Sequence, residues 1–457
     1  MKIYIDEILN ATGGKLYGNK DTKDVYVVGA AIDSRNVKDN YLFIPNITES
    51  FDGQDFIQNS FESGAIATLV QRDIENIDES KYYIKVENIK EAFLKLAKYN
   101  RQKYNIPVIG ITGSVGKTTA KEMIATVLEE KYNVLRTYGN FNSELGLPLM
   151  VMGIEEEHEI AVLEMGTDHE GEMSILESVA KPTDAVIMNI GVSHLEKFGT
   201  RDNIYKEKSN IFKNILEKEA ILLNQDNDIL IKFKDVVNAT WYGQNGENIS
   251  GNIIKIEDGK VYIKVKYNGE ETEYVIPGLS EHLVYPAMAA IYFGMKYNLS
   301  KEEIANGLLK YKSLKMRMDI QKLDNGILVI DDTYNANPQS MKAAIDVLEK
   351  LEHKNKIAIL GDMFELGDDS DNMHKEVGTY LINKNITQVI LVGNNAKHIY
   401  EGLNENTNNK QVYYFENKDE MYKQIKEIID IDNTAILLKA SRGMKFEEII
   451  AKIKELK

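Results

Sequence analysis

The chain has 457 residues, too many for a single hydrophobic core, and this length indicates roughly two to four domains. Its 71 acidic and 55 basic residues give a formal net charge of −16, which argues against nucleic acid and anionic membranes as partners. There is no cysteine and no long apolar run at the start, so we exclude disulfides, zinc–thiolate sites and cysteine nucleophiles, and expect no signal peptide, no membrane insertion and a cytoplasmic location.

Residues 1–105 alternate short strand and helix patterns, closed by a helix from 89 to 104, and predict a small α/β domain. Two polar clusters, Asp33-Ser34-Arg35 and the DGQDF of residues 52–56, follow predicted strands, where ligands often bind. Asp and Gly are also the usual residues of tight turns. From the residues alone, a binding role and a simple turn both stay open.

Residues 106–132, IPVIGITGSVGKTTAKEMIATVLEEKY, predict a buried strand, a glycine-containing turn and an amphipathic helix. Gly113 and Gly116 let backbone N–H groups face an anion, which the start of the helix also attracts. Lys117 is placed to reach the outer phosphates of a nucleotide, and Thr118 to offer a hydroxyl to Mg²⁺. The usual phosphate-loop pattern has its first glycine two residues before Gly113, so the match is good but not strict. An ordinary turn with a solvated lysine is the alternative.

Two further apolar runs, 159–166 and 184–191, predict parallel strands covered by helices on both faces. Glu164, Asn189 and the phosphate loop then fall at the carboxyl ends of strands, where ligands collect in such sheets. Glu164 is therefore either a candidate Mg²⁺ ligand or a cap of the next turn.

His194 and Lys208 have no distinctive pattern of their own. A lone histidine after a strand is more often packed or solvated than a ligand. Lys208, with Lys206, lies in YKEKSNIF, which is typical of the charged face of a solvated helix. The residues alone therefore predict no functional role for either side chain.

Residues 220–280 are rich in strand patterns, and Asp258-Gly259 and Asn268-Gly269 predict hairpins. We therefore expect residues 106–314 to form a central phosphate-loop ATPase domain with a parallel sheet and an inserted β-rich segment. Four buried-strand patterns in residues 315–457 predict a second open α/β sheet, Rossmann-like in layout but without a GxGxxG after any strand. The predicted fold class is α/β with three domains.

Taken together, the motifs resemble those of the Mur ligases, ATP-dependent enzymes that form amide bonds in peptidoglycan precursor synthesis. The resemblance covers nearly the whole chain, in the order DSR, DGQDF, GSVGKTT, GNFNSELGLP, LEMG, NIGVSHLEKFG, DDTYNANPQSM, LGDMFELG and KASRG. GSVGKTT alone would indicate only a nucleotide-binding protein. DDTYNANPQSM with LGDMFELG is far more specific, and is similar to the family member that adds D-alanyl-D-alanine.

The resemblance implies ATP and two Mg²⁺ ions as cofactors, and a role for each matching residue. The ATP phosphates would contact Gly113, Ser114, Val115, Gly116, Lys117, Thr118 and Thr119, and the nucleotide would be reached from the third domain by Arg317, Asn335 and Asn337. The metal ligands would be Thr118, Glu164, His194 and a Lys208 carrying a carbamate, as many family members do. Asp33, Ser34 and Arg35 would bind the uridine end of a sugar nucleotide, Asn142 would lie near the substrate, and the catalytic residues would be Lys117, Lys208 and His194.

Several positions depart from the family pattern. Asn210 stands where the family usually has glutamate, Ser143 where a second asparagine is common, and Ala440 where glycine is common. His282-Leu283, with Pro286, replaces an HN...N run that would contact adenine.

The resemblance implies a reaction in which the carboxylate of UDP-N-acetylmuramoyl-tripeptide attacks the γ-phosphate of ATP to form an acyl phosphate, which the amine of D-Ala-D-Ala then attacks. We expect these small molecules as partners, no nucleic acid, and a monomer. One alternative is a related ligase that adds a different amino acid, of the tripeptide-forming or folylpolyglutamate type. Another is an ATP-binding relative that has lost catalysis.

Overall fold

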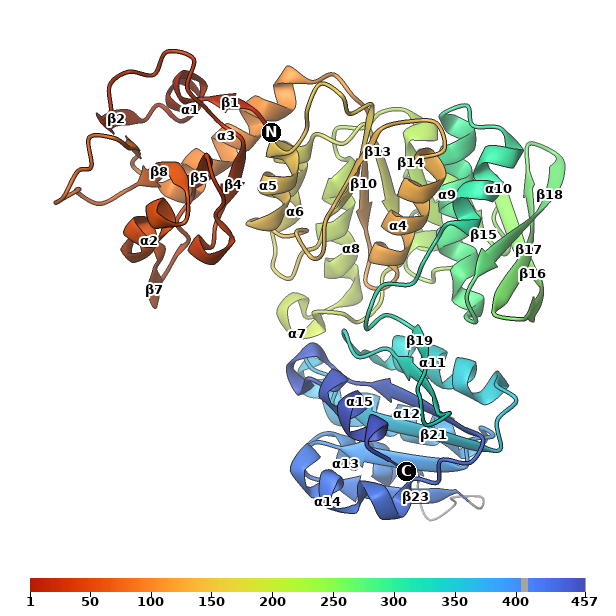
Figure 1. The fold of residues 1–457 in the computed structure, drawn as a ribbon. Coiled ribbons are helices and arrows are strands. Elements are labelled where there is room, and N and C mark those ends of the chain that lie inside the picture. Colours follow the sequence, from red (N-terminus) through yellow and green to blue (C-terminus); the bar gives the residue numbers. More distant parts are fainter. Residues whose placement is uncertain (404–409, 457) are drawn as a thin grey trace.

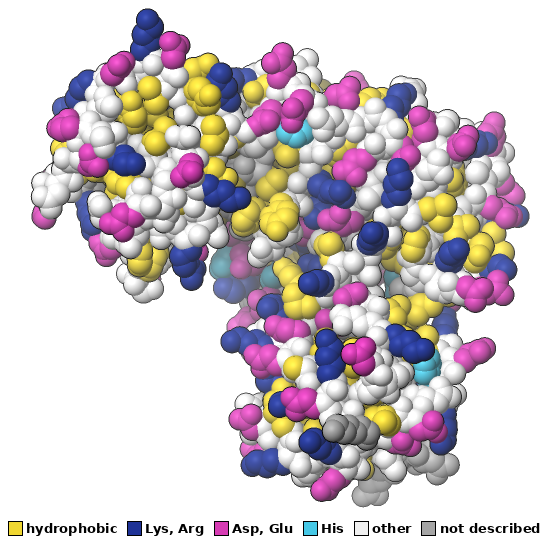
Figure 2. Space-filling view, viewed as in Figure 1, with side chains coloured by type: hydrophobic (Ala, Val, Ile, Leu, Met, Phe, Trp, Pro, Cys, Tyr) yellow, Lys and Arg dark blue, Asp and Glu magenta, His cyan; other side chains and the backbone are white. Residues whose placement is uncertain are grey.

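The computed structural model describes residues 1–403 and 410–456. Within these residues three larger sheets follow one another along the chain. They lie in what we call the N-terminal, middle and C-terminal parts, with strands at residues 3–85, 108–277 and 319–439. The N-terminal part lies beside the middle part, and the C-terminal part lies below it (Figure 1). The space-filling view shows an open notch between the N-terminal and C-terminal parts (Figure 2).

The N-terminal part contains a mixed sheet whose strands are parallel except for the first edge pair. In spatial order its strands are β2 (Lys15–Gly18), β9 (Tyr82–Lys85), β8 (Ala65–Val70), β5 (Tyr41–Phe43) and β4 (Gly29–Ala31). Around it lie α1 (Ile5–Thr12), α2 (Ile57–Glu62) and the short pairs β1 (Ile3–Tyr4) with β3 (Tyr26–Val27) and β6 (Ile47–Thr48) with β7 (Phe51–Asp52). The helix α3 (Ile89–Lys103), capped by Asn88, contacts both this part and the middle part.

The middle part, whose strands are all described, is built on one nine-stranded sheet. Its spatial order is β11 (Val134–Arg136), β12 (Ile160–Glu164), β10 (Val108–Thr112), β13 (Asp184–Ile187), β14 (Ile221–Asn224), β15 (Thr240–Gly243), β16 (Ile249–Glu257), β17 (Lys260–Tyr267) and β18 (Glu270–Pro277). The pairs are parallel from β11 to β16 and antiparallel from β16 to β18. The β-rich segment therefore continues the parallel sheet.

Both predicted hairpins are confirmed. Asp258-Gly259 and Asn268-Gly269 join β16 to β17 and β17 to β18, and all four residues have positive φ. Asn, Asp and Gly tolerate this conformation, and its twist matches that of the flanking strands. Local turn chemistry therefore fixes the register of the sheet's antiparallel edge.

Helices cover both faces of the middle sheet: α4 (Lys117–Leu128), α5 (Gly146–Met152), α6 (Glu172–Ala180), α8 (Arg201–Ser209), α9 (Val284–Lys296) and α10 (Lys301–Leu309). The short α7 (Leu195–Phe198) lies at the lower edge of this part (Figure 1). The predicted apolar face of α4 is confirmed, because Ala120, Ile124, Val127 and Leu128 are all fully buried. Pro286 lies in the first turn of α9, where its missing N–H costs no helical hydrogen bond.

The C-terminal part carries a second α/β sheet, described within residues 319–403 and 410–439. Its spatial order is β19 (Asp319–Lys322), β20 (Leu328–Asp331), β24 (Thr434–Lys439), β21 (Asn355–Gly361), β22 (Gln388–Val392) and β23 (Gln411–Phe415), with only β19 antiparallel. Its helices are α11 (Pro338–Lys350), α12 (Ser370–Ile382), α13 (Ala396–Leu403), α14 (Lys418–Ile428) and α15 (Glu447–Lys454). The predicted α/β class with parallel sheets is confirmed. Among all described residues, no helix combines the length and apolar character needed to cross a membrane.

Candidate active site

The phosphate loop connects the fully buried strand β10 to α4 at the carboxyl edge of the middle sheet. Gly116, the residue before α4, has φ of 80°, a left-handed conformation that glycine adopts without strain. Asn189, after the neighbouring strand β13, accepts hydrogen bonds from the N–H groups of Ser114 and Val115 at 3.1 and 2.9 Å and donates to the Val115 carbonyl at 2.9 Å. The loop is therefore held open by a neighbouring strand.

Lys117 turns back onto its own loop. Its Nζ donates to the carbonyl oxygen of Gly113 at 2.7 Å. Burial lowers the pKa of Lys117; Glu164 opposes this shift, and Arg317 adds to it. A carbonyl is a weak partner for an ammonium group, so an anion entering the loop would be the stronger one.

A cavity of about 1500 Å³ opens in front of this loop, between the middle and C-terminal parts. Of the predicted site residues, it is lined by Ser114, Val115, Gly116, Lys117, Thr118, Thr119, Asn142, Glu164, His194, Arg317, Asn335 and Asn337. Gly113 and Lys208 are not among the lining residues. The structure thus brings together residues separated by more than 200 positions of the chain.

Glu164 ends β12 inside this cavity and is 2% exposed. Its Oε1 accepts a hydrogen bond from Asn142 Nδ2 at 2.7 Å, while Oε2 has no hydrogen-bond partner among the described residues. A buried carboxylate oxygen without a partner is costly. Together with the nearly buried Thr118 at the start of α4, it offers the oxygen ligands that Mg²⁺ prefers.

Lys208, on α8, is 1% exposed. The expectation from the residues alone, a solvated helix face, is therefore wrong for Lys208; it describes Lys206, whose side chain is 77% exposed. The only hydrogen bond of Lys208 Nζ within the described chain is to Thr167 Oγ1, at 3.4 Å. Burial lowers the pKa of Lys208 to about 7, with a further lowering by Lys117 that Glu207, Glu172 and Asp168 oppose.

His194 precedes α7 with φ of 60°, a left-handed conformation that is uncommon outside glycine. Its Nδ1 lies 2.6 Å from Oε2 of Glu365, which comes from the loop after β21 in the C-terminal part. This contact with His194 holds the pKa of Glu365 below its usual value. His194 thus belongs to the middle part, and its partner Glu365 belongs to the C-terminal part.

The C-terminal part contributes three predicted residues to the cavity. Arg317 stacks its guanidinium 3.7 Å from the ring centre of Tyr334. Asn335 accepts the N–H of Ala336 through its side chain, at 2.9 Å. Asn337 caps α11 and donates from Nδ2 to Ser193 Oγ at 3.1 Å, across to the middle part.

Asp33, Ser34 and Arg35 lie in the N-terminal part and do not line the cavity described above. Asp33 accepts the N–H of Arg35 at 2.9 Å, and its carboxylate pairs with the Arg35 guanidinium at 2.6 Å. These hydrogen bonds lower the pKa of Asp33. The cluster therefore has a local turn role, and a second, binding role stays a prediction.

The departures from the family pattern have local explanations. Asn210 turns back onto α8 and donates to the carbonyl oxygens of Lys206 and Glu207 at 3.2 and 3.1 Å. Ala440 is fully buried, and its methyl group packs where a Cβ on Gly361 would lie only 2.8 Å away. The other departures, Ser143, His282, Leu283 and Pro286, line the large cavity.

The motif analysis assigned no role to several cavity residues, although Ser193 and Lys439 lie in the quoted motifs NIGVSHLEKFG and KASRG. Ser193 bridges the two parts, donating to the Ser114 carbonyl at 3.2 Å. Lys439 is 2% exposed and donates to the Asn335 carbonyl at 2.9 Å. Asp168 and Glu172 also line the cavity. The signal for these two acids was available, since they follow the strand that ends in Glu164.

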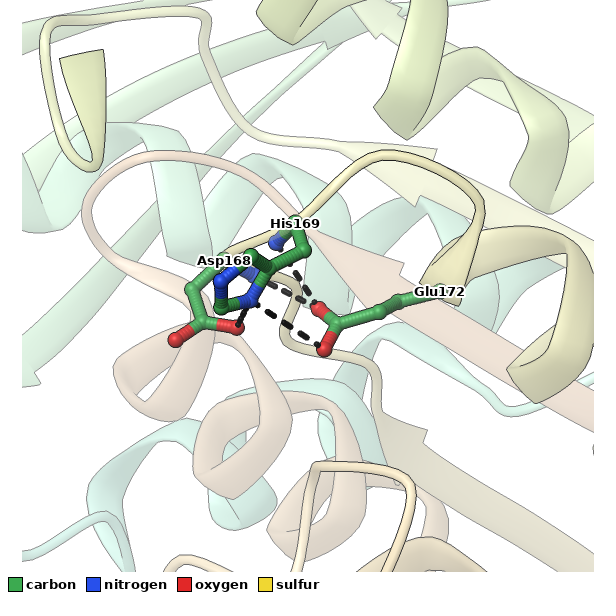
Figure 3. A group of neighbouring side chains, drawn as sticks. All are labelled: Asp168, His169 and Glu172. Atoms are coloured by element: carbon green, nitrogen blue, oxygen red, sulfur yellow. Dashed lines mark hydrogen bonds and ion pairs between the residues drawn. The ribbon is translucent and has the colours of Figure 1, made fainter. Parts of the chain in front are cut away.

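Asp168, His169 and Glu172 form a group whose candidate ligand atoms lie within 4.8 Å of one another (Figure 3). Glu172 Oε2 already accepts the N–H groups of Asp168 and His169, at 2.8 and 3.0 Å. The Nζ of Lys197 lies 3.0 Å from His169 Nε2, where its charge would oppose a metal ion. The geometry therefore fits a capped turn at the start of α6 better than a metal centre.

A smaller cavity of about 170 Å³ lies beside the His194–Glu365 contact. Its lining comes mainly from the C-terminal part and includes Tyr334, Asn335, Ser441 and Arg442. Ser441 is 2% exposed and accepts the N–H of Phe364 at 2.8 Å. The KASRG segment, the last of the family motifs along the chain, thus lines part of this second cavity.

The chain is similar to known proteins over nearly its whole length. Residues 111–294 match the family model "Mur ligase middle domain", and residues 316–442 match "Mur ligase, glutamate ligase domain". The UDP-N-acetylmuramoyl-tripeptide–D-alanyl-D-alanine ligase of Bacillus subtilis (strain 168) is 38% identical over 94% of this chain and 94% of its own. The crystal structure of MurF from Acinetobacter baumannii is similar with a TM-score of 0.90 and 29% identity, covering 100% of this chain and 99% of that one. MurF ligase from Thermotoga maritima in complex with ADP has a TM-score of 0.80 and 26% identity, covering 95% and 98%. The chain belongs to the Mur ligase family.

Proposed function

We propose that this protein is the ATP-dependent ligase that joins D-alanyl-D-alanine to the tripeptide carboxylate of UDP-N-acetylmuramoyl-tripeptide, acting in the cytoplasm as a monomer. The full-length similarity to relatives that carry this name supports the substrate assignment. The single observation that carries the chemistry is the phosphate loop. Within the described residues its lysine donates only to a carbonyl oxygen, and it lines a cavity together with a buried carboxylate that has one oxygen without a hydrogen-bond partner there.

Each of the three predicted domains has its own proposed binding role. Residues 1–105 would bind the sugar nucleotide, with Asp33, Ser34 and Arg35 at its uridine end. Residues 106–314 would bind the ATP phosphates along the loop from Gly113 to Thr119. Residues 315–457 would close on the nucleotide with Arg317, Asn335 and Asn337, and the acceptor dipeptide would enter through the smaller cavity.

In the proposed first step, a tripeptide carboxylate oxygen attacks the γ-phosphorus of ATP, and ADP leaves with the electron pair of the broken P–O bond. Negative charge gathers where these anions meet, so catalysis depends mainly on positioning and electrostatic stabilisation. Lys117 would leave the Gly113 carbonyl and stabilise the transferring phosphoryl group. Asn142, hydrogen-bonded to Glu164, would orient the carboxylate end of the substrate. The neutral amine of the dipeptide then attacks the acyl carbon, the C–O bond to phosphate breaks with its electron pair going to phosphate, and the nitrogen releases one proton as the amide forms.

Two Mg²⁺ ions would supply positive charge at the phosphoryl oxygens. The residues fit such ions because Glu164 keeps one buried oxygen that has no hydrogen-bond partner in residues 1–403 and 410–456. Thr118 and Glu164 would hold one ion, and His194 and Lys208 would bind the other. An unmodified ammonium cannot ligate a metal, so Lys208 needs either to lose its proton or to gain a carboxylate.

Carbamylation of Lys208 would provide that carboxylate. The neutral amine forms a bond to the carbon of CO₂ and releases one proton to solvent. A pKa of about 7 keeps a large fraction of Lys208 neutral at physiological pH, whereas an ordinary lysine is almost wholly protonated there. Incubation with ¹³C-bicarbonate should give a carbamate signal in the ¹³C spectrum of the wild-type protein, and none in Lys208→Met.

One assay tests the proposed function. Phosphate release is measured with ATP, UDP-muramoyl-tripeptide and D-Ala-D-Ala together, and again with either the tripeptide or the dipeptide omitted. The mass of the product is determined by mass spectrometry. Release that requires both substrates, with the dipeptide added to the product, supports the proposal. A product formed with another amino acid would indicate a different family activity, and no release with any combination would indicate a non-catalytic relative.

Lys117→Ala should reduce phosphate release by roughly 10³-fold or more, because it removes the charge that stabilises the transferring group. Lys131→Ala, at the exposed far end of the same helix region, is the matched control and should keep normal turnover. Normal release by Lys117→Ala would refute the proposed mechanism.

A further inference from the structure

The contact between His194 and Glu365 joins the middle and C-terminal parts at the rim of the large cavity. Nδ1 of His194 is buried and has no hydrogen bond of regular geometry among the described residues. Oε2 of Glu365 nevertheless lies 2.6 Å away, a distance that suits a hydrogen bond. The two groups are therefore in contact but not aligned, so a small relative movement could complete the bond.

Glu365 is held in place by the C-terminal part. The preceding residues are fixed by two buried side chains: His374 Nε2 accepts the N–H of Met363 at 3.0 Å, and Ser441 Oγ accepts that of Phe364 at 2.8 Å. Glu365 itself has φ of 62°, an uncommon conformation for a residue with a side chain. Strain of this kind persists where the surrounding structure imposes it, often at functional sites.

The histidine side of the contact is fixed by the middle part. The carbonyl oxygen of His194 accepts the N–H groups of Lys197 and Phe198, at 3.0 and 3.2 Å, which locks its backbone onto α7. On the same helix, the N–H of Glu196 donates to the carbonyl oxygen of Glu365 at 3.3 Å. Figure 1 shows α7 at the lower edge of the middle part, facing the C-terminal part. Two strained residues from different parts thus meet at two points.

We propose that Glu365 is a positioning residue for His194, aligning its imidazole as a metal ligand when the C-terminal part docks. The proposal rests on the proposed function, in which His194 binds Mg²⁺. A histidine that binds a metal through one ring nitrogen usually donates the other N–H to a carboxylate or carbonyl, which fixes its tautomer and orientation. Glu365 contacts Nδ1, which leaves Nε2 for the metal.

This arrangement links closure of the molecule to assembly of its metal site. The carboxylate that orients His194 comes from the C-terminal part, so the second ion binds strongly only when that part is docked. Other charged groups near the pair do not replace Glu365 in this role. Lys197 is engaged by His169 Nε2 at 3.0 Å, and Asp168 by His169 Nδ1 at 2.8 Å. ATP activation would therefore wait for docking.

The test uses Glu365→Ala and Glu365→Gln in the full-length protein. Mn²⁺, which gives an electron paramagnetic resonance signal, replaces Mg²⁺ and is titrated in the presence of ADP. We expect Glu365→Ala to weaken one of two Mn²⁺ sites by roughly 10- to 100-fold, as loss of a hydrogen-bonded partner of a metal ligand usually does. Glu365→Gln should stay within about 3-fold of wild type, since its amide oxygen can still accept the N–H.

The second readout needs no metal. Protein labelled with ¹⁵N-histidine is compared by NMR, with the His194 signals assigned by their loss in His194→Gln. Wild type and Glu365→Gln should hold the proton on Nδ1, and Glu365→Ala should shift toward the Nε2–H tautomer. Asp368→Asn, an exposed acid nearby in the same loop region, is the matched control and should behave as wild type in both measurements.

Unchanged Mn²⁺ affinity and an unchanged His194 tautomer in Glu365→Ala would overturn the inference. So would an equal loss in Glu365→Gln and Glu365→Ala, because a hydrogen-bond acceptor would then not be what matters. Wild-type product formation is measured alongside. If the wild type forms the expected product while Glu365→Ala binds metal normally, only the inference fails; if the wild type forms no product, the proposed function fails.

Discussion

The two junctions of the molecule are built in opposite ways. Between the N-terminal and middle parts, one hydrophobic core is continuous, running from residues such as Leu42 and Phe93 to Leu163 and Ile187 of the middle sheet. The helix α3 crosses this junction, and its buried polar side chains donate hydrogen bonds to backbone carbonyl oxygens. Asn100 donates to three carbonyl oxygens at the end of α5, at 3.0 to 3.1 Å.

Between the middle and C-terminal parts, the C-terminal sheet keeps its own two core clusters. Its side-chain hydrogen bonds and ion pairs across the junction include Asn337 with Ser193 and His194 with Glu365, and Val192 and Leu279 of the middle part pack against one of these clusters. The connecting segment contains Met316 and Met318, both with positive φ. A large cavity lined by residues of both parts separates the rest of the two surfaces.

The difference shows how the same kind of residue can serve stability or function. Arg101 and Lys208 are both buried basic side chains. Among the residues that the structure describes, Arg101 donates to four carbonyl oxygens, whereas Lys208 makes one long hydrogen bond. A satisfied buried charge fixes structure, and an unsatisfied one is costly until a ligand arrives. Arg101 therefore stabilises the first junction, whereas Lys208 keeps hydrogen-bonding capacity for a ligand.

The largest expected effect comes from Arg101→Ala. The Arg101 guanidinium donates to Ala180, Tyr104, Ile106 and Lys181, so its loss leaves buried carbonyl groups without partners. We expect a loss of about 3 kcal/mol in unfolding free energy, read as a lower transition temperature by calorimetry. Lys95→Ala, an exposed position of the same helix, should change stability by less than about 0.5 kcal/mol. Equal stability of the two variants would mean that the first junction is not held by Arg101.

Lys208→Met should change the unfolding free energy in the opposite direction and raise it. Because burial lowers the pKa of Lys208 to about 7, the folded state holds fewer protons than the unfolded state between this pH and about 10.4. Wild-type stability should therefore rise with pH across that window. Replacing the buried amine by an apolar side chain should add about 2 kcal/mol at pH 7, and the gain should fall toward zero as the pH approaches about 10.4.

The measurement is calorimetry in CO₂-free buffers, so that no carbamate forms. Lys206→Met is the matched control: its side chain is 77% exposed on the same helix, and it should leave both stability and its pH dependence unchanged. A Lys208→Met protein that is less stable than wild type at pH 7 would show that the buried amine is satisfied, and would remove the contrast with Arg101.

Much of the fold can be read from the sequence because its signals are local. The Asp-Gly and Asn-Gly turns fix their hairpins, and helical spacing identifies the buried face of α4. The continuation of the β-rich segment into the parallel sheet rests on the pairing of β15 with β16, which no local pattern encodes. The role of α3 is equally hidden, since Asn100 and Arg101 are residue types normally found in solvent.

Some residues of the candidate site could likewise be predicted from local sequence patterns, and others could not. Lys117 and Glu164 were predicted from their place after buried strands, and both line the cavity. His194 and Lys208 were singled out only by family resemblance, because burial of Lys208 depends on surroundings that YKEKSNIF does not show. Glu365 lies more than 150 residues from His194, so their contact exists only in the folded protein.

Ser193→Ala tests the second junction directly. Its hydroxyl accepts from Asn337 Nδ2 at 3.1 Å and donates to the Ser114 carbonyl at 3.2 Å, linking the C-terminal part to the phosphate loop. Loss of these bonds should cost about 1 kcal/mol, and we expect the KM for ATP to rise about 5-fold while the transition temperature changes little. Ser209→Ala, which loses one hydrogen bond within its own helix, should keep the wild-type KM. An unchanged KM in Ser193→Ala would mean that the link does not support nucleotide binding.

The smallest effect is expected for Lys350→Ala. Lys350 pairs with Glu281 across the second junction, but both side chains are about half exposed, at 48% and 55%. Exposed ion pairs contribute roughly 0 to 1 kcal/mol and are weakened by salt, so we expect a change below about 0.5 kcal/mol and little change in small-angle scattering. Lys354→Ala, which breaks a pair with Asp432 inside the C-terminal part, is the control. If Lys350→Ala alone opened the molecule at low salt, and 0.5 M NaCl did the same to wild type, a surface pair would hold the C-terminal part in place. Electrostatic attraction would then close the second junction before any substrate binds. A ligand bound to the polar groups of the cavity would not be required to bring the two parts together.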